Sequence, residues 1–324
     1  MLPPRSGGAS PCSRLRPVLQ VAQGRNRGDT MGRTVSLRSD ALSAEISTLG
    51  AELRALADAE GRALLWHGDP AFWTGRAPLL FPIVGELPDL TLVHDGKGHP
   101  MRRHGFARFS EFEVVAEAPD RATFRLLPTE ATRAEYPFDF ALEVTFALDG
   151  ATLAMEAVVT NPGPGVLPAS FGYHPAFLWP LPYGGTRAEH RVIFAEPEPA
   201  PIHRPVNGLL SRASEPSPAA DGVLKPDDAM FERDALIFLG LNSHRLQYGV
   251  PGRPGLDITF PGMPDLGIWT KPGAPYLCIE PWSGYATPEG DTRPFVEKPG
   301  LLHIPAGEER RFVMNVSLIP EVAA

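Results

Sequence analysis

Apolar residues recur at every second position through most of the chain, and this period of two restricts the fold to one built from strands. In FALEVTFAL, residues 140–148, every second side chain from Phe140 to Leu148 is large and apolar, which is typical of a half-buried strand. The alternation resumes over residues 153–159, beyond an Asp149-Gly150 pair of the kind that favours tight turns. The two segments predict an antiparallel hairpin.

The same alternation recurs in short segments along the rest of the chain. Further strands are predicted at residues 34–47, 110–118, 122–129, 244–250, 256–260, 276–280 and 311–319. The 37 prolines support this interpretation, because helix interiors exclude proline while turns and sheet edges accept it. We therefore expect an all-β antiparallel sandwich or barrel with few, short helices.

The first 33 residues differ from the remainder in composition. They are rich in Arg, Gly, Pro and Ser without a sustained period, which predicts a disordered leader. Met31 just precedes the first patterned segment, so the leader is open to a second interpretation as an upstream-start artefact. Residues 34–324 are expected to form one domain, in which the proline-rich segments 195–208 and 211–222 are long loops.

Charge, cysteine content and motifs exclude several classes of function. The net charge of −8 and the lack of a basic stripe argue against a nucleic-acid partner. No apolar run approaches the roughly 20 residues of a membrane span, and no secretory signal is evident, so we expect a cytoplasmic protein without a membrane partner. Cys12 and Cys278 show no disulfide or metal spacing. P-loop, zinc-protease and nucleophile-elbow motifs do not occur.

Two histidines are candidates for chemistry. His174 in FGYHPAF precedes a proline, which favours extended geometry and places it on one face with Ser170 and Gly172, opposite Phe171 and Tyr173. Its alternative is a histidine satisfied inside the sheet.

His104 precedes Gly105, which permits close backbone approach. An exposed loop histidine is the alternative there.

Two carboxylates are the matching candidates. Glu280 in PYLCIEPWSG also precedes a proline, and alternation places it on one face with Tyr276 and Cys278. A buried carboxylate needs a partner, so a structural ion pair is its alternative. Asp234 leads into an apolar strand and is open to interpretation as a turn cap.

Two other chemistries fit less well. His94, His99 and His104 lie five residues apart, which is not a ligand spacing on a helix or a strand, so no metal is expected. Asp234 and Glu280 could also form the carboxylate pair of a glycosidase, a hypothesis that depends on their separation.

Six motifs, taken together and in order, resemble the aldose 1-epimerase family of galactose mutarotase-like proteins, in particular its bacterial branch of uncertain substrate. They are RAPLLFPIVGEL, HGFARFSEF, FGYHPAF, DALIF, LGIWT and CIEPWSG, and the resemblance runs from about residue 34 to 320. It implies a large antiparallel β-supersandwich, which agrees with the strand pattern. The longer asparagine-containing motifs of the better-known galactose mutarotases are not present.

The resemblance also implies site residues. Glu280 matches the general base that takes the proton from the anomeric hydroxyl, and His174 matches the acid that protonates the ring oxygen. His104, Asp234 and Arg76 match sugar-binding residues, and Arg76 is the weakest of these correspondences.

The resemblance implies an isomerase that interconverts the α and β anomers of a free aldose without a metal or an organic cofactor. The expected partner is the small-molecule sugar, and the expected oligomeric state is a monomer or a homodimer. Trp282, Phe106 or Tyr173 could stack on the sugar or fill the core. Arg102, Arg103 and Arg108 leave a hexose 6-phosphate mutarotase open. A non-catalytic carbohydrate-binding or sensor protein is the alternative from another class.

Overall fold

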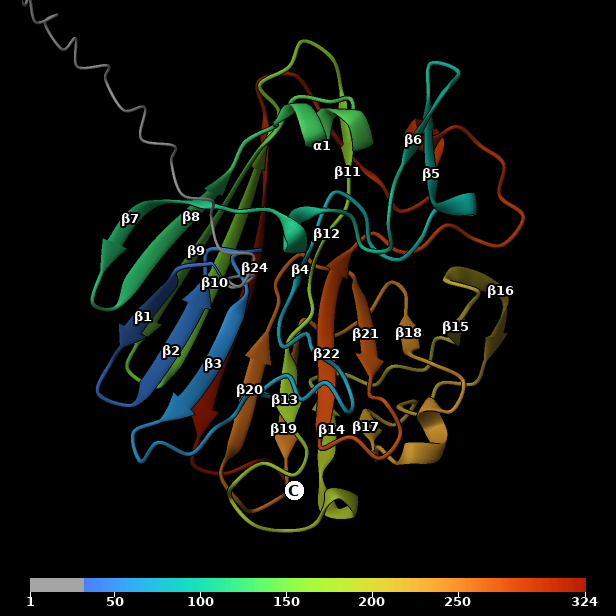
Figure 1. Ribbon diagram of the computed structural model, residues 1–324. Helices are drawn as coiled ribbons and strands as arrows, with labels where there is room; N and C mark the ends of the chain where they lie inside the picture. Colours follow the sequence, from blue (N-terminus) through green and yellow to red (C-terminus); the bar gives the residue numbers. More distant parts are fainter. Residues whose placement is uncertain (1–31) are drawn as a thin grey trace, which may run out of the picture. The chain divides into compact units, whose positions relative to one another are not determined.

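The computed structural model describes residues 32–324, and antiparallel β-sheets dominate this part of the chain (Figure 1). Residues 1–31 of the predicted leader lie outside the described residues. The first strand begins at Thr34. That residues 34–324 form a single domain stays a prediction. No helix in the described range is both long and apolar enough to cross a membrane.

The larger sheet is built around the predicted hairpin. Its strands run in the order β17 (Val223–Leu224), β14 (Arg191–Phe194), β19 (Arg245–Gly249), β20 (Gly255–Thr259), β24 (Glu309–Ile319), β10 (Thr152–Thr160), β9 (Ala141–Asp149), β8 (Arg121–Leu126) and β7 (Glu113–Ala118). The turn between β9 and β10 is shifted by one residue from the prediction. Asp149 ends β9 opposite Thr152, and only Gly150 of the predicted pair has a positive φ, of 51°.

The second sheet carries the motif residues. Its order is β16 (Leu209–Glu215), β15 (Ile202–Val206), β18 (Leu236–Phe238), β21 (Asp265–Trp269), β22 (Tyr276–Ser283), β12 (Phe171–Tyr173) and β4 (Leu79–Leu80), with β13 (Ala176–Leu178) also paired to β22. The predicted long loops are wrong here, because β15 and β16 form a hairpin. Asn207 and Gly208 both have positive φ, as a tight hairpin turn requires. Pro205 lies at a register shift, where a missing N–H is tolerated.

Smaller pairings and short helices complete the described chain. The pairings are β1 (Thr34–Arg38) with β2 (Leu42–Ser47) and β3 (Leu53–Asp58), β11 (Leu167–Ala169) with β23 (Leu302–Ile304), and β5 (Thr91–His94) with β6 (Lys97–Pro100). The helical segments described are α1 (Glu130–Glu135) and the 3-10 turns η1 (Pro88–Leu90), η2 (Ala107–Phe109), η3 (Arg187–Glu189), η4 (Asp228–Phe231) and η5 (Phe295–Glu297). The expectation of an all-β fold with few, short helices is confirmed.

The main core joins the two large sheets. Phe171 of β12 stacks on Phe312 of β24 with ring centroids 4.9 Å apart. The Tyr173 hydroxyl donates hydrogen bonds to the carbonyl oxygens of Met155 and Phe312. Leu277 and Ile279 of β22 are fully buried in the same core. One face of the second sheet is thereby occupied, and alternation directs Cys278 and Glu280 to its other face.

Candidate active site

A cavity of about 360 Å³ lies against that other face of the second sheet, within the roughly 300–1,000 Å³ typical of small-molecule sites. Four of the five catalytic and sugar-binding residues that the resemblance implied line it: His104, His174, Asp234 and Glu280. The remaining lining residues include Trp73, Trp269, Trp282, Arg103 and Arg108. The fold thus brings together residues from positions 73 to 286.

His174 and Glu280 form a buried pair at this cavity. Nε2 of His174 lies 3.2 Å from Oε2 of Glu280, and the two residues are 7% and 2% exposed. β22 supplies Glu280, while His174 lies between β12 and β13, both of which pair with β22. Pro175 follows directly, and its carbonyl oxygen accepts a hydrogen bond from the N–H of Ile279. The backbone on both sides of the pair is therefore fixed by the sheet.

Burial shifts the pKa values of the two groups in opposite directions. It raises the pKa of the Glu280 carboxyl well above its usual range, and the nearby charge of Asp234 raises it further. It lowers the pKa of the His174 imidazole to about 3, and the positive charge of Arg108 adds to this effect. Burial therefore favours the neutral form of both groups, with the proton on Glu280 and not on His174.

His104 is held by a backbone contact that fixes its tautomer. The N–H of Gly85 donates to Nδ1 of His104 at 3.1 Å, so the neutral ring carries its proton on Nε2. Burial lowers the pKa of His104 well below its usual range, and the charges of His174, Arg108 and Arg103 lower it further. His104 is therefore a neutral hydrogen-bond donor.

Gly105 provides the close backbone approach predicted for this motif. It has a φ of 73°, and an added Cβ would lie 2.1 Å from the carbonyl oxygen of Phe81. His104 itself has a φ of 63°, an uncommon value for a residue other than glycine. Backbone strain at a cavity wall is frequent at functional sites.

Trp282 forms a flat wall of the cavity because its neighbours on adjacent strands are glycines. A Cβ on Gly172 or Gly267 would lie 2.5 or 2.4 Å from the indole ring. Of the other two predicted stacking residues, Tyr173 and Phe106 are 2% and 3% exposed and belong to the main core. For these two, the core-filling alternative is the one observed.

Trp73 and Trp269 complete the aromatic lining, and motif reasoning missed both as lining residues. The Trp73 ring lies 5.1 Å from the His174 ring and 5.6 Å from the Trp269 ring, measured between centroids. Trp73 lies in an irregular segment without periodicity. The sequence feature that could have indicated Trp73 is the high density of aromatic residues at positions 66–73.

Arg76 is not among the residues that line this cavity. One of its terminal guanidinium nitrogens donates to the carbonyl oxygen of Arg54 at 2.6 Å, and its backbone N–H donates to Glu52. Arg103 and Arg108 line the cavity instead. Arg103 is paired with Glu86 through a hydrogen bond of 2.5 Å.

Asp234 lines the cavity and is also held locally. Its carboxylate accepts a hydrogen bond from the N–H of Ala235, and Arg204 donates to its carbonyl oxygen. Asp234 can therefore cap the turn and line the cavity at the same time, because the turn uses only one of its two carboxylate oxygens.

The three-histidine metal site weighed above is not found within residues 32–324. His94 packs against Phe138, and His99 hydrogen-bonds the carbonyl oxygen of Ala134, while His104 faces the cavity.

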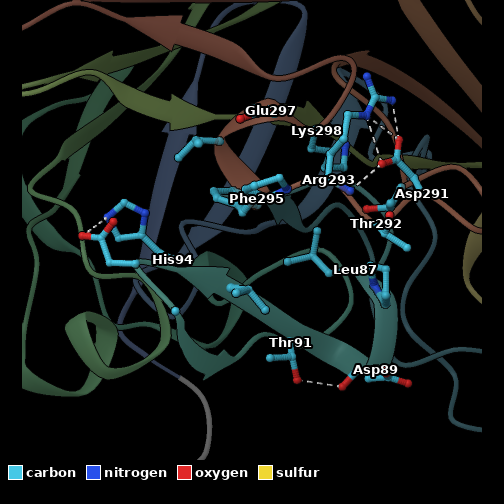
Figure 2. Close-up of a pocket in the computed structure, with 17 residues that line it drawn as sticks. Leu87, Asp89, Thr91, His94, Asp291, Thr292, Arg293, Phe295, Glu297 and Lys298 are labelled. Carbon is cyan, nitrogen blue, oxygen red and sulfur yellow. Dashed lines mark hydrogen bonds and ion pairs between the residues drawn. The ribbon is translucent and has the colours of Figure 1, made fainter.

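A second, larger cavity of about 700 Å³ lies between β5 and the segment around η5 (Figure 2). Phe295 and Leu87 contribute to its lining, and Asp291 and Arg293 form an ion pair there. Its imidazole–carboxylate contact, His94 with Asp95, involves a carboxylate that is 86% exposed. The buried pair at the smaller cavity is the stronger candidate, because burial is what shifts pKa values for acid–base work.

Comparison with known proteins decides the family. The sequence model of the aldose 1-epimerase family matches residues 33–317. The chain belongs to the aldose 1-epimerase family. Protein LacX, chromosomal, of Lactococcus lactis subsp. lactis is 32% identical over 283 residues, which cover 84% of this chain and 94% of LacX.

Solved structures of related proteins agree with this assignment. A galactose mutarotase related enzyme from Lactobacillus acidophilus has a TM-score of 0.81 and 27% identity, and the match covers 90% of this chain and all of that one. A galactose mutarotase-like protein from Lactobacillus casei also has a TM-score of 0.81, with 25% identity and 89% and 100% coverage. This aldose 1-epimerase family member therefore has a galactose mutarotase-like fold.

Proposed function

We propose that this protein is a mutarotase that interconverts the α and β anomers of a free aldose. The observation that carries the proposal is the buried contact of 3.2 Å between His174 and Glu280 at the cavity. In the reacting form, the proton of the pair has moved from Glu280 to His174 across their contact. The sugar C1 hydroxyl then loses its proton to the Glu280 carboxylate while the His174 imidazolium protonates the ring oxygen, and the C1–O5 bond breaks. Rotation about C1–C2 and closure with reversed roles give the other anomer.

The shifted pKa values favour this direction of proton transfer. A carboxyl with a raised pKa is a strong base when ionised, and an imidazole with a lowered pKa is a strong acid when protonated. Ring opening leaves the proton on Glu280 and a neutral His174, which is the arrangement that burial favours. No metal or organic cofactor is needed for these two transfers.

The other lining residues fit a sugar ligand. The Nε2–H of His104 and the carboxylate of Asp234 are suited to sugar hydroxyls, and the flat Trp282 ring is suited to an apolar sugar face. The assay is the anomer ratio of freshly dissolved α-D-glucose and α-D-galactose, followed by NMR or polarimetry. We expect equilibration faster than in buffer alone.

The pH dependence of kcat/KM is expected to be broad. The pair must hold one proton, so activity is lost at low pH when His174 takes a second proton and at high pH when Glu280 loses its own. Because the pKa of His174 is lowered to about 3, the acid limb should lie well below pH 6.5, where an ordinary histidine titrates, and the raised pKa of Glu280 shifts the basic limb upward. Initial rates between pH 5 and 9, corrected for buffer catalysis, check this. An acid limb centred near pH 6.5 would contradict the assigned shifts.

One observation favours a second candidate, a mutarotase for hexose 6-phosphates. Nε of Arg108 is buried and has no hydrogen-bond partner within the described chain, and burial together with the charge of Arg103 lowers its pKa. An arginine in this state is suited to an anionic group of the substrate.

Substitution of Arg108 separates the two candidates. If the substrate is a hexose 6-phosphate, Arg108→Gln should lower kcat/KM for it by about 10- to 100-fold, the equivalent of the roughly 1.5–3 kcal/mol of a charged hydrogen bond. The same change should leave free hexoses much less affected. Arg311→Gln, at an exposed ion pair on β24, is the control. Equal losses for both sugars would exclude a phosphate-binding role for Arg108.

A further inference from the structure

Cys278 lies beside the acid–base pair and has no part in the proposed sugar chemistry. It is two residues before Glu280 on β22, so both side chains leave the same face of the strand. Its Sγ, a ring nitrogen of His174 and a carboxylate oxygen of Glu280 all lie within 4.8 Å of one another. All three residues are buried, and Cys278 is a free thiol.

We propose that Cys278, His174 and Glu280 form an inhibitory binding site for a thiophilic divalent cation, with zinc as the best fit. Thiolate, imidazole and carboxylate are the three ligand types that zinc uses, and three protein ligands with an open fourth position are a common zinc arrangement. This inference rests on the proposed function only for its inhibitory consequence. The binding itself depends on the three side chains alone.

The geometry needs little adjustment to accept the ion. Two ligand atoms about 2.1 Å from a tetrahedral zinc ion lie about 3.4 Å apart, and the His174 to Glu280 contact is already 3.2 Å. A thiolate at about 2.3 Å would lie about 3.6 Å from the other two ligands. The separation of the sulfur from each of the other two ligand atoms, now at most 4.8 Å, must therefore shorten by at most about 1.2 Å.

The position of the pair at the cavity supports metal binding. His174 and Glu280 line the cavity, which leaves the fourth coordination position to a water or a sugar hydroxyl from that side.

Charge balance also favours a dication. The Cys278 thiol and the Glu280 carboxyl release their protons to solvent, and the ion then binds one thiolate, one carboxylate and one neutral imidazole. The assembled site carries no net charge, which reduces the cost of placing an ion in a buried position. The bound ion occupies the lone pairs that accept and deliver the proton, so mutarotation stops.

Calorimetry with zinc chloride and visible spectroscopy with cobalt(II) test the site on the full chain in a non-chelating buffer. We expect one zinc per chain and a cobalt spectrum with thiolate charge-transfer bands. Removal of a group that only hydrogen-bonds a metal ligand typically lowers metal affinity by roughly 10–100-fold. Cys278→Ala removes a ligand itself, so it should lower the zinc affinity by more than this and abolish the charge-transfer bands. Cys12→Ser, which removes the chain's other cysteine, should change neither.

Activity provides an independent comparison. Zinc should inhibit the wild type and Cys12→Ser at the same concentration, whereas Cys278→Ala should stay active at zinc concentrations at least about tenfold higher. The proposal is wrong if Cys278→Ala binds zinc as tightly as the wild type, or if the cobalt spectrum lacks thiolate bands. Cys278-dependent binding in a protein that equilibrates no sugar would contradict the proposed function and leave the metal site standing.

Discussion

Glu280→Gln is expected to remove most of the acceleration of anomer equilibration. Glutamine keeps the shape of the side chain but cannot accept the C1 proton, and a positioned acid–base group contributes on the order of 10²–10⁴-fold. Because burial already raises the pKa of this carboxyl, the substitution removes a group whose charged form is costly in the folded state. We therefore expect the melting temperature to stay the same or rise while the activity is lost.

Glu143→Gln on β9 is the matched control. Its side chain is 45% exposed and lies 3.8 Å from Arg125, and β9 belongs to a different sheet from β22. Anomer kinetics and thermal unfolding should be measured on both variants. Full activity in Glu280→Gln would show that another group is the base.

His174→Asn is expected to cause a loss of similar size. Asparagine can hydrogen-bond Glu280 but cannot deliver a proton to the ring oxygen, so the second of the two transfers fails. The double variant with Glu280→Gln should be little slower than either single variant, because groups that act as a unit are not additive. Steady-state kinetics of the three proteins, with the uncatalysed rate subtracted, measure this.

His99→Asn is the control for the histidine substitution, since His99 lies on the β5–β6 hairpin and hydrogen-bonds the carbonyl oxygen of Ala134 in α1. It should retain wild-type rates. Losses that multiply in the double variant would contradict the paired mechanism and indicate two independent contributions.

The strands were predictable because their signal is local. Alternation over residues 140–159 and 311–319 depends on neighbours two positions away, and the structure confirms these strands. The β15–β16 hairpin was missed because its prolines were interpreted as a loop. Only pairing with β18 and the register shift near Pro205 make a strand of that segment, and neither is visible in local composition.

The site was predictable only in part. The faces of His174 and Glu280 follow from alternation and the prolines that succeed them, whereas their contact depends on the pairing of β12 and β13 with β22. Trp73 reaches the cavity from an irregular segment and Arg108 from the short 3-10 turn η2, and in neither does a period indicate direction. Arg76 was the weakest of the correspondences that the resemblance implied, and its guanidinium bonds Arg54 instead of lining the cavity.

The most direct test of the account is the anomer-exchange rate for a panel of free aldoses and their 6-phosphates, measured by NMR with the wild type and Glu280→Gln at equal concentration. The account predicts that the wild type accelerates exchange of at least one sugar and that Glu280→Gln loses this acceleration. Exchange at the buffer rate for every sugar, with binding detected for one of them, would contradict catalysis and favour a carbohydrate-binding protein.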